Sequence, residues 1–565
     1  MATEAKASGT KRSKRFEFYD TQRQLALDGF AKEWVDVGLV AMESPNDPKP
    51  SIKIVDGVVV EMDGKERKDF DIIDRFIADY SIDQRISEKA MAVDSVEFAR
   101  WLVDINVPRK KICEYTVGMT PAKLNEVFAQ MDVLEMTMAG HKMRARRTPS
   151  IQAHITNRKD DPLQLACDAA SAGLYGFSEM ETTVGVGRYA PDNALGLMIG
   201  SQVGRAGILS QCAVEEATEL LLGMRGLTAY AETVSNYGVE RIFLDGDDTP
   251  WSKAFLGSCY ASRGLKMRFT SGTGAEVLMG EAEHKSMLYL EIRCILMTRG
   301  SGVQGIQNGG ISCVCIPGCV PGGFRAIMAE NLCVMMNDLE VVSGNDYQVS
   351  NSDIRRTARL MPQLLSGTDF IFSGFGFIPA YDNMFTASSF NGEDLDDYTV
   401  ICRDLRIDGG VQPVNEEEFI TIRRKAGKAI QAVCDELGLP PISDEAVEQC
   451  VYAFGSKDTA PRDSKDNLKA SEIILKEKIN GVDLIKALAK RGFTDVAENV
   501  LNMMKAHVSG DYLQTSAIFD ENFVPLSAVN DANDYQGPGT GYRAIGERWE
   551  QIQDIRQALS SADLA

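Results

Sequence analysis

The chain has 565 residues, and its 60 Lys and Arg stand against 81 Asp and Glu, which gives a formal net charge of −21 at pH 7. Such an excess of acid argues against a surface that neutralises nucleic-acid phosphates or adheres to anionic lipid. A hydrophobic fraction of 44% and a charged fraction of 25% are typical of a globular protein and exclude global disorder.

The beginning of the chain and its cysteines indicate the compartment. Residues 1–20 are polar and lack the apolar core of a secretory signal, and no apolar run approaches the roughly 18 residues of a membrane span. The 12 cysteines are too sparse for a disulfide scaffold, and Cys294, Cys333 and Cys434 have mostly apolar neighbours. We therefore expect a cytoplasmic protein with reduced, buried cysteines.

Residues 1–150 predict a mixed N-terminal extension. The segment 51–63, SIKIVDGVVVEMD, alternates apolar and polar residues about Asp56 and Gly57, which predicts a β-hairpin, and a helical stretch follows. The basic cluster KMRARRTPS at 142–150 is interpreted as a solvated turn or a subunit contact, because a nucleic-acid site would need a much more basic chain.

Residues 151–400 predict the central unit, a (β/α)8 TIM-type barrel of the α/β class. Short apolar runs that end in a polar residue recur, with helix-like stretches such as 214–224 between several of them, as in βαβ units with a parallel sheet. About eight such runs favour a closed barrel over an open sheet. The interval from 235 to 241 is too short for a crossover helix, so not every run can be a barrel strand. The runs are QAHIT (152–156), ETTVGVG (181–187), YAETVS (230–235), RIFLD (241–245), MRFTSG (267–272), VQGIQNG (303–309), EVVSGND (340–346) and DFIFSGFG (369–376).

Residues 401–565 predict a C-terminal helical extension. Asn415 is a good N-cap with Glu418 as its capping-box partner, and apolar residues then keep helical spacing until Gly438. A second helix is predicted to begin at Thr494. Both helices are expected to cover the barrel.

Two partial motifs do not amount to sites. The match to GxGxxG at 300–305 is followed by strand and loop, whereas a dinucleotide site needs a helix there. Cys313, Cys315 and Cys319 lack the second ligand pair of a zinc site. The sequence contains no GxxxxGK[ST], HExxH or GxSxG, which excludes the common NTPase, metalloprotease and serine-hydrolase motifs.

A set of polar residues lies in or at the ends of the apolar runs: Gln152, His154, Glu181, Glu232, Gln307, Asp346 and Ser373. In a (β/α)8 barrel the C-terminal strand ends converge on one mouth, where catalytic residues are found. Clustered carboxylates require a cation or a hydrogen-bonding substrate, and a set of two carboxylates, two amides and a hydroxyl suits a hard cation such as Ca²⁺. Spacing alone fits equally well a barrel whose polar strand ends have no role in chemistry.

Strings spread from about residue 25 to the C-terminus resemble the large (alpha) subunit of adenosylcobalamin-dependent diol dehydratase and glycerol dehydratase. They include AMESPNDPKPSIKI (41–54), RYAPDNA, GSQVGR, EEATEL, YAETVS, DGDDTPWSKAFL, YASRGLKMRFTSG, RRTARL, GFTDVA, SAVNDANDY and GERWE. The strings have no low-complexity explanation, so the resemblance is specific.

The resemblance implies a carbon–oxygen lyase that dehydrates 1,2-propanediol or glycerol to an aldehyde and water, with adenosylcobalamin (coenzyme B12) as cofactor. It implies Ca²⁺ or K⁺ at the substrate site. The residues that would hold this cation are Gln152, Glu181, Glu232, Gln307 and Ser373. His154 and Asp346 would hydrogen-bond the migrating hydroxyl, and Glu181 with Gln307 the hydroxyl that stays. The cofactor-contact positions would be Glu216, Thr233, Ser235, Asp245, Gly272, Ser312 and Met384.

The same resemblance implies a radical mechanism and a multi-subunit enzyme. An adenosyl radical would take hydrogen from C1 of the diol, and partial protonation by His154 with partial deprotonation by Glu181 would ease the hydroxyl migration. No nucleophile is needed, in agreement with the missing hydrolase motifs. Partners would be a medium and a small dehydratase subunit, in a dimer of heterotrimers, and a reactivating factor. The sequence leaves open whether the enzyme is free in the cytosol or inside a bacterial microcompartment.

Several positions depart from the family pattern. Ala213, Ala275 and Leu278 replace polar residues near the cofactor, and Tyr347, with the aromatic residues after Ser373, differs beside the substrate pocket. These departures leave open which diol is preferred. Two alternatives also stay open: a related cobalamin radical enzyme for a different vicinal diol, and a non-catalytic cobalamin-binding paralogue.

Overall fold

We describe a computed structural model of the chain. It covers residues 41–144, 149–156, 179–183, 207–213, 228–234, 267–270, 285–300, 308–309, 323–346, 360–374, 398–407, 415–452 and 481–498, and single helical or loop residues among 163–177 and 199–204.

A small antiparallel sheet opens the described chain. Strand β1 (Ile52–Val55) pairs with β2 (Val58–Met62), and β3 (Lys65–Glu66) pairs with β2. Asp56 and Gly57 join β1 to β2 with φ angles of 51° and 75°, the left-handed pair that a type I′ hairpin turn requires. The predicted hairpin is therefore confirmed, with its turn at the predicted residues.

Short helices follow the hairpin, and capping residues define their starts. At one helix start, Asp132 and Glu135 form a reciprocal capping box, and at another Thr120 precedes Pro121. The elements are η1 (Arg67–Asp69), α2 (Ile72–Phe76), the π-helical η2 (Ile77–Ser81), α3 (Gln84–Met91), α4 (Ser95–Val103), α5 (Arg109–Thr116), α6 (Pro121–Ala129) and α7 (Val133–Met143).

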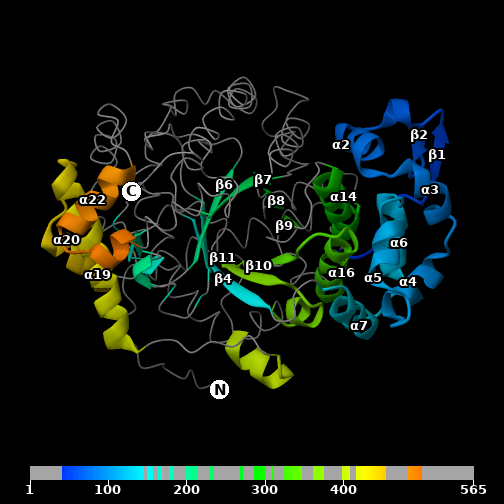
Figure 1. Ribbon diagram of the computed structural model, residues 1–565. Coiled ribbons are helices and arrows are strands. Elements are labelled where there is room, and N and C mark those ends of the chain that lie inside the picture. Colours follow the sequence, from blue (N-terminus) through cyan, green and yellow to red (C-terminus); the bar gives the residue numbers. More distant parts are fainter. Residues whose placement is uncertain are drawn as a thin grey trace, which may run out of the picture.

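An eight-stranded sheet forms the centre of the molecule (Figure 1), in the order β10-β11-β4-β5-β6-β7-β8-β9. Every neighbouring pair in it is parallel. The two strands at the ends of this order, β9 and β10, also contact each other. The strands are β4 (Ser150–Thr156), β5 (Glu179–Thr183), β6 (Gly207–Ala213), β7 (Thr228–Val234), β8 (Met267–Thr270), β9 (Asn308–Gly309), β10 (Val342–Asp346) and β11 (Phe370–Gly374).

The predicted runs and the observed strands agree with two exceptions. The run at 241–245 lies outside the described residues, and strand β6 was not predicted. In β6 only Ile208 and Leu209 are strongly apolar before Ser210 and Gln211, so the apolar stretch is too short to stand out as a strand.

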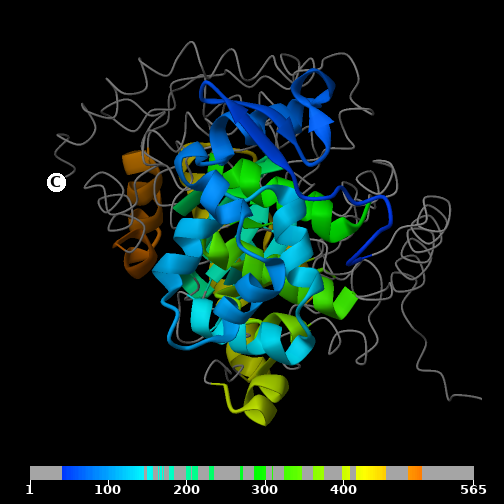
Figure 2. The same cartoon turned by 90° about the vertical axis from the view of Figure 1, so that its right-hand side faces the viewer.

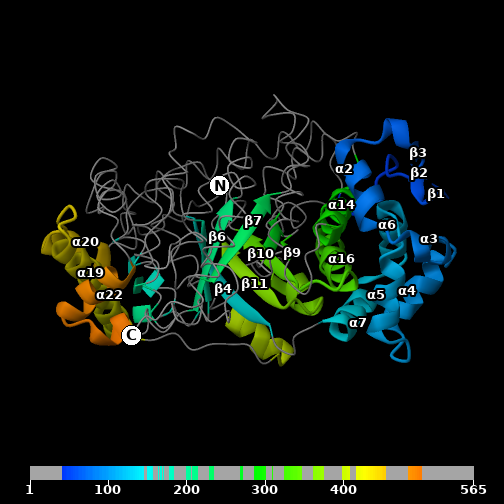
Figure 3. The same ribbon diagram turned by 45° about the horizontal axis from the view of Figure 1, so that its top comes forward.

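Two helices, α14 (Met287–Gly300) and α16 (Gly323–Met336), lie between the sheet and the N-terminal helices, as Figures 2 and 3 show. Helix α14 contacts α2 and α6, and α16 contacts α5 and α7. Nearly all their side chains are buried, because a helix covered on two sides has no solvent face to carry polar residues. The N-terminal region thus covers the outer side of two helices that flank the sheet.

Helices α19 (Glu416–Leu437), α20 (Asp444–Tyr452) and α22 (Gly481–Lys490) lie on the opposite side of the sheet (Figure 1). The side chain of Asn415 accepts a hydrogen bond of 2.9 Å from the N–H of Glu418, and Gly438 ends α19 with a φ of 69°. Both predicted ends of this helix are confirmed. Helical structure also begins at Thr494, as predicted, and the remainder of that predicted helix lies outside the described residues.

The cysteines singled out in the sequence lie in the core. Cys294, Cys333 and Cys434 are buried, as their apolar neighbours predicted. Within the described part of the chain, no helix has the length and apolar character needed to cross a membrane.

Candidate active site

Of the residues predicted to bind the cation or the substrate hydroxyls, all except Gln307 lie on described strands of the large sheet. Gln307 is outside the described residues and immediately precedes β9. The others are Gln152 and His154 in β4, Glu181 in β5, Glu232 in β7, Asp346 in β10 and Ser373 in β11.

The closest association among them is between His154 and Glu181. These two residues are register partners on the neighbouring strands β4 and β5, and two positions earlier Gln152 is the partner of Glu179. Register partners on parallel strands share one face of a sheet. The chain therefore brings its candidate proton donor and its candidate carboxylate base together through backbone pairing alone.

Register also relates the more distant strands. The partner of Glu181 in β6 is Leu209. Ala213, four residues after Leu209 in β6, is the partner of Glu232 in β7. On the other side of β4, Gln152 pairs with Phe372 of β11. Gly374, two residues after Phe372 in the same strand, pairs with Asp346 of β10. Because residues alternate between faces with a period of two, one face of the sheet carries this set: Gln152, His154, Glu181, Glu232 and Asp346.

Ser373 belongs to the other set of alternating positions. Its register partners are Asn345 in β10 and Ala153 in β4, each one residue away from a predicted site residue. The sequence had suggested a serine hydroxyl beside the carboxylates, whereas alternation assigns Ser373 to the opposite face.

The candidate residues lie toward one edge of the sheet. Asp346 ends β10 and Ser373 is the penultimate residue of β11, while His154, Glu181 and Glu232 each lie two residues before the end of their strand. Since all these strands are parallel, their C-terminal ends lie at the same edge. A set of carboxylate, amide and imidazole groups at this edge can orient a polar substrate and exchange protons with it.

Two charged residues of the same face were not predicted. Glu179 pairs with Gln152, and Arg268 in β8 pairs with Glu232. For Arg268 the signal was a charged residue between the apolar Met267 and Phe269. Glu179 had no such signal, because Met180 is the one apolar residue of β5.

The candidate cofactor positions are described for one residue only. Thr233 lies in β7 beside Glu232 and pairs with Phe269. The other positions lie outside the described residues: Glu216, Ser235, Asp245, Gly272, Ser312 and Met384. Of the departures from the family pattern, Ala213 ends β6 as the partner of Glu232, and Ala275, Leu278 and Tyr347 are not described. Among the described side chains, no three His, Cys, Asp or Glu residues gather as a metal site.

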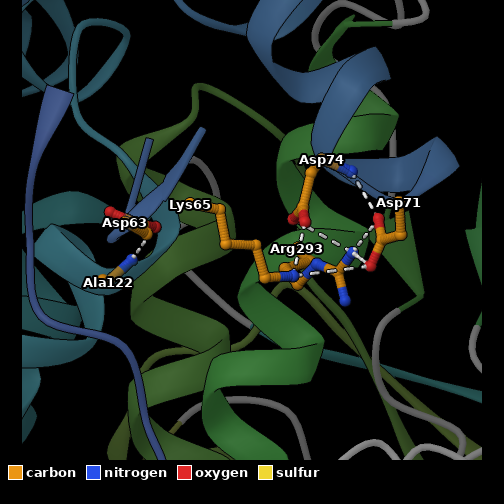
Figure 4. A network of polar contacts seen from close by, with 6 residues as sticks. All are labelled: Asp63, Lys65, Asp71, Asp74, Ala122 and Arg293. Atoms are coloured by element: carbon orange, nitrogen blue, oxygen red, sulfur yellow. Dashed lines mark hydrogen bonds and ion pairs between the residues drawn. The ribbon is translucent and has the colours of Figure 1, made fainter. Parts of the chain in front are cut away.

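A partly buried ionic network joins α14 to the N-terminal region (Figure 4). The Arg293 guanidinium lies 2.6 Å from both Asp71 carboxylate oxygens and 3.2 Å from Asp74, and the Lys65 ammonium lies 2.7 Å from Asp74. Partial burial works to raise the pKa of Asp71, but the charge of Arg293 and the N–H of Asp74 outweigh it and the pKa is lowered. The network binds a helix that flanks the sheet to the region that covers it.

A second polar contact, also in Figure 4, holds the hairpin to α6. Asp63 follows β2, and its Oδ2 accepts a 2.9 Å hydrogen bond from the N–H of Ala122. Burial raises the pKa of this carboxyl to about 7, although hydrogen bonds from Thr120 and Ala122 act in the opposite direction.

Buried charges also lie on the two flanking helices themselves. Burial, and then the neighbouring charge of Glu291, raise the pKa of Glu330 well above its ordinary value. Arg299 at the end of α14 donates to the carbonyl of Ser81 and to Asn337 Oδ1, and burial lowers its pKa to about 10. These groups connect helices to one another, which is a structural role beside the sheet.

Comparison with known proteins gives consistent matches. The family described as dehydratase large subunit matches residues 11–563 of this chain. The glycerol dehydratase large subunit of Citrobacter freundii is 61% identical over 545 residues, which cover 96% of this chain and 98% of that protein. Wild-type GGGPS from Thermoplasma volcanium, a solved structure, aligns with 47% of this chain and 98% of its own at 11% identity and a TM-score of 0.29, a likeness too weak to bear on the fold.

Proposed function

Because the chain belongs to the family of dehydratase large subunits, we propose that it is the catalytic large subunit of an adenosylcobalamin-dependent diol or glycerol dehydratase. The substrate would be 1,2-propanediol or glycerol, and the products an aldehyde and water. The family resemblance found in the sequence is confirmed by the match over residues 11–563. The observation that carries the proposal is 61% identity to a glycerol dehydratase large subunit over 96% of the chain. The family match over residues 11–563 includes every candidate site residue.

We propose that the eight parallel strands close into a (β/α)8 barrel. Their order in the sheet follows the order of the chain once β10 and β11 are placed before β4, and the contact between β9 and β10 supports closure. Residues 1–150 and 401–565 would then be extensions of a barrel formed by residues 151–400.

The proposed cation site is compatible with the positions of the strand residues. Gln152, Glu181 and Glu232 share one face of the sheet, with Glu181 and Glu232 two residues before their strand ends and Gln152 four before its own. Their oxygen donors suit Ca²⁺ or K⁺. Gln307, just before β9, would complete the side-chain donors. For Ser373, which belongs to the alternate set of positions, we propose that the main-chain carbonyl supplies the oxygen, because its position does not depend on which face the side chain occupies.

Bound adenosylcobalamin would supply the radical that removes a hydrogen atom from C1 of the diol. The chain's own residues would then control the hydroxyl groups. Glu181 and Gln307 would hold the hydroxyl that stays, which a bound cation would help to orient, while His154 and Asp346 would hold the one that migrates. His154 donates a hydrogen bond to the migrating oxygen as negative charge develops there, and Glu181 accepts one from the other hydroxyl. A closed barrel excludes water until the resulting 1,1-diol dehydrates.

We propose that a medium and a small subunit complete the enzyme, in a dimer of heterotrimers served by a reactivating factor. The family is described as dehydratase large subunit, and the word large implies that smaller subunits exist. We place the enzyme in the cytoplasm, either free or inside a bacterial microcompartment.

A second candidate is a related cobalamin radical enzyme for a different vicinal diol. Tyr347 directly follows Asp346, the last residue of β10, and Phe375 directly follows the last residue of β11. Bulky side chains after the strand ends would reshape the substrate pocket more than the cation site.

An anaerobic assay of the co-expressed subunits with adenosylcobalamin tests these proposals. Aldehyde from 1,2-propanediol or glycerol supports the first, and aldehyde from other diols only supports the second. Cobalamin binding without any turnover would refute both and indicate a non-catalytic paralogue. Glu181→Ala should bind cobalamin and form no aldehyde, whereas Glu417→Ala, at an exposed position of α19, should turn over normally. Near-normal turnover of Glu181→Ala would contradict its role.

A further inference from the structure

A buried aspartate joins the N-terminal ends of strands β10 and β11. The Oδ2 atom of Asp369, the residue before β11, accepts a 2.9 Å hydrogen bond from the N–H of Val341, the residue before β10. Thr368 Oγ1 donates to the carbonyl of Val341 at 3.4 Å. Asp369 and Val341 are 0% exposed and Thr368 is 3% exposed, so water does not compete for these bonds.

This contact continues the backbone ladder by one step. The first register pair of the two strands is Val342 with Phe370, and the same offset runs on to Asp346 with Gly374. Val341 and Asp369 are the next pair of positions toward the N-terminal ends of the two strands. There the carboxylate oxygen of Asp369 accepts the hydrogen bond in place of a main-chain carbonyl. Any shift of one strand along the other would break this bond.

The segment before Asp369 is itself held in place. Asn331 of α16 donates a 2.8 Å hydrogen bond to Ser366 Oγ. Gly140 of α7 approaches so closely that a Cβ built on it would lie 1.9 Å from the Ser366 carbonyl oxygen, and Gly367 has a left-handed φ of 79°. The turn that precedes Asp369 therefore cannot slide without displacing two helices.

The register of β10 decides where Asp346 lies. A slip of one residue would move Asp346 from the face it shares with His154 and Glu181 to the opposite face. It would also change its height relative to Ser373, whose partner is Asn345. Asp369 acts on these residues from a distance, because the strands carry roughly 15 Å of chain between it and the C-terminal edge.

We propose that Asp369 is a positioning residue for the dehydration site: its carboxylate fixes the register of β10 against β11 and thereby holds Asp346 and Ser373 in place. The proposal rests on the proposed function, in which Asp346 binds the migrating hydroxyl. Asp369 lies at the N-terminal end of β11, whereas Asp346 and Ser373 lie at the C-terminal ends of their strands. Since Asp346 acts on a group that moves during the reaction, its displacement should affect turnover more than substrate binding.

The test compares Asp369→Ala with Asp369→Asn in the assembled enzyme. Asp369→Ala should lower kcat about tenfold or more, while KM for the diol and the Kd for cobalamin change less than about threefold. Asp369→Asn keeps an oxygen that can accept from Val341, so it should recover kcat to within about threefold of the unaltered enzyme. If Asp369→Ala does not assemble, Asp369→Glu replaces it, because one added methylene displaces the carboxylate, and the same fall in kcat is expected.

Controls separate this proposal from a general loss of stability and from the proposed function. Asp63→Ala removes the acceptor of another buried main-chain N–H, also at 2.9 Å, and should leave kcat within about twofold. An unchanged kcat in Asp369→Ala beside an inactive Asp346→Ala would overturn the positioning role and leave the proposed function intact. An equal loss in Asp369→Ala and Asp369→Asn, or in Asp63→Ala, would also overturn it. Normal turnover by Asp346→Ala would instead contradict the proposed function.

Discussion

Replacement of Asp63 by asparagine tests how the stability of the N-terminal region depends on pH. Asp63 is 5% exposed, and its Oδ2 accepts the N–H of Ala122 in the first turn of α6. Burial raises its pKa to about 7, although hydrogen bonds from Thr120 and Ala122 act to lower it. Asparagine keeps an acceptor oxygen at this position and removes the titrating proton.

The magnitude follows from the difference between the folded and unfolded pKa. Because the folded chain binds the proton more tightly, stability is greatest below about pH 4, falls as pH rises to about 7, and is constant above that. A rise of the pKa from 3.8 to about 7, at about 1.36 kcal/mol per pH unit, corresponds to about 4 kcal/mol. Between about pH 5 and pH 8 the unaltered chain should lose about 3 kcal/mol that Asp63→Asn does not lose.

Urea unfolding of the full-length protein at several pH values measures this difference. Tryptophan fluorescence is a suitable signal, because Trp101 of α4 packs edge-on against Tyr115, with 5.1 Å between ring centroids. Asp63→Ala also lacks the titrating group but leaves the Ala122 N–H without this acceptor. It should therefore follow the pH profile of Asp63→Asn at a stability lower by about 1–3 kcal/mol. Parallel pH profiles for Asp63→Asn and the unaltered protein would refute the reasoning.

Two further predictions concern the contacts between the N-terminal region and the rest of the fold. Arg293→Met removes the guanidinium that lies 2.6 Å from Asp71 and 3.2 Å from the buried carboxylate of Asp74. Because Lys65 still pairs with Asp74, the free energy of unfolding should fall by about 2 kcal/mol; a urea midpoint within error of the unaltered protein would contradict this. Gly140→Ala places a methyl group 1.9 Å from the Ser366 carbonyl oxygen and should cost about 1–3 kcal/mol through overpacking. A calorimetric melting temperature that does not fall would show that the helix and the turn can separate freely.

Local patterns in the sequence predicted the local elements well. The left-handed pair Asp56 and Gly57 forms the hairpin turn, and Asn415 and Gly438 mark the two ends of α19. Turns and caps depend on residues within a few positions of one another, so their signal is contained in a short window. Strand β6 was not predicted because its apolar stretch is short.

The candidate site was predicted in part. Polar residues at the ends of apolar runs identified Gln152, His154 and Glu181 as candidates, but spacing could not reveal that His154 and Glu181 are register partners. It also could not reveal that Ser373 belongs to the alternate set of positions. Register depends on how two strands align, and each strand's own sequence is compatible with several alignments.

The sequence by itself determined the family, the hairpin, the helix ends and the polar character of the strand ends. Only the tertiary structure decided which distant residues meet, as for Arg293 with Asp71 across 222 positions of chain and Asp369 with Val341 across 28. The physical reason is that turns and caps are set by bonds between near neighbours in the chain. Contacts between distant residues and the registers of strands exist only after packing has brought both partners together.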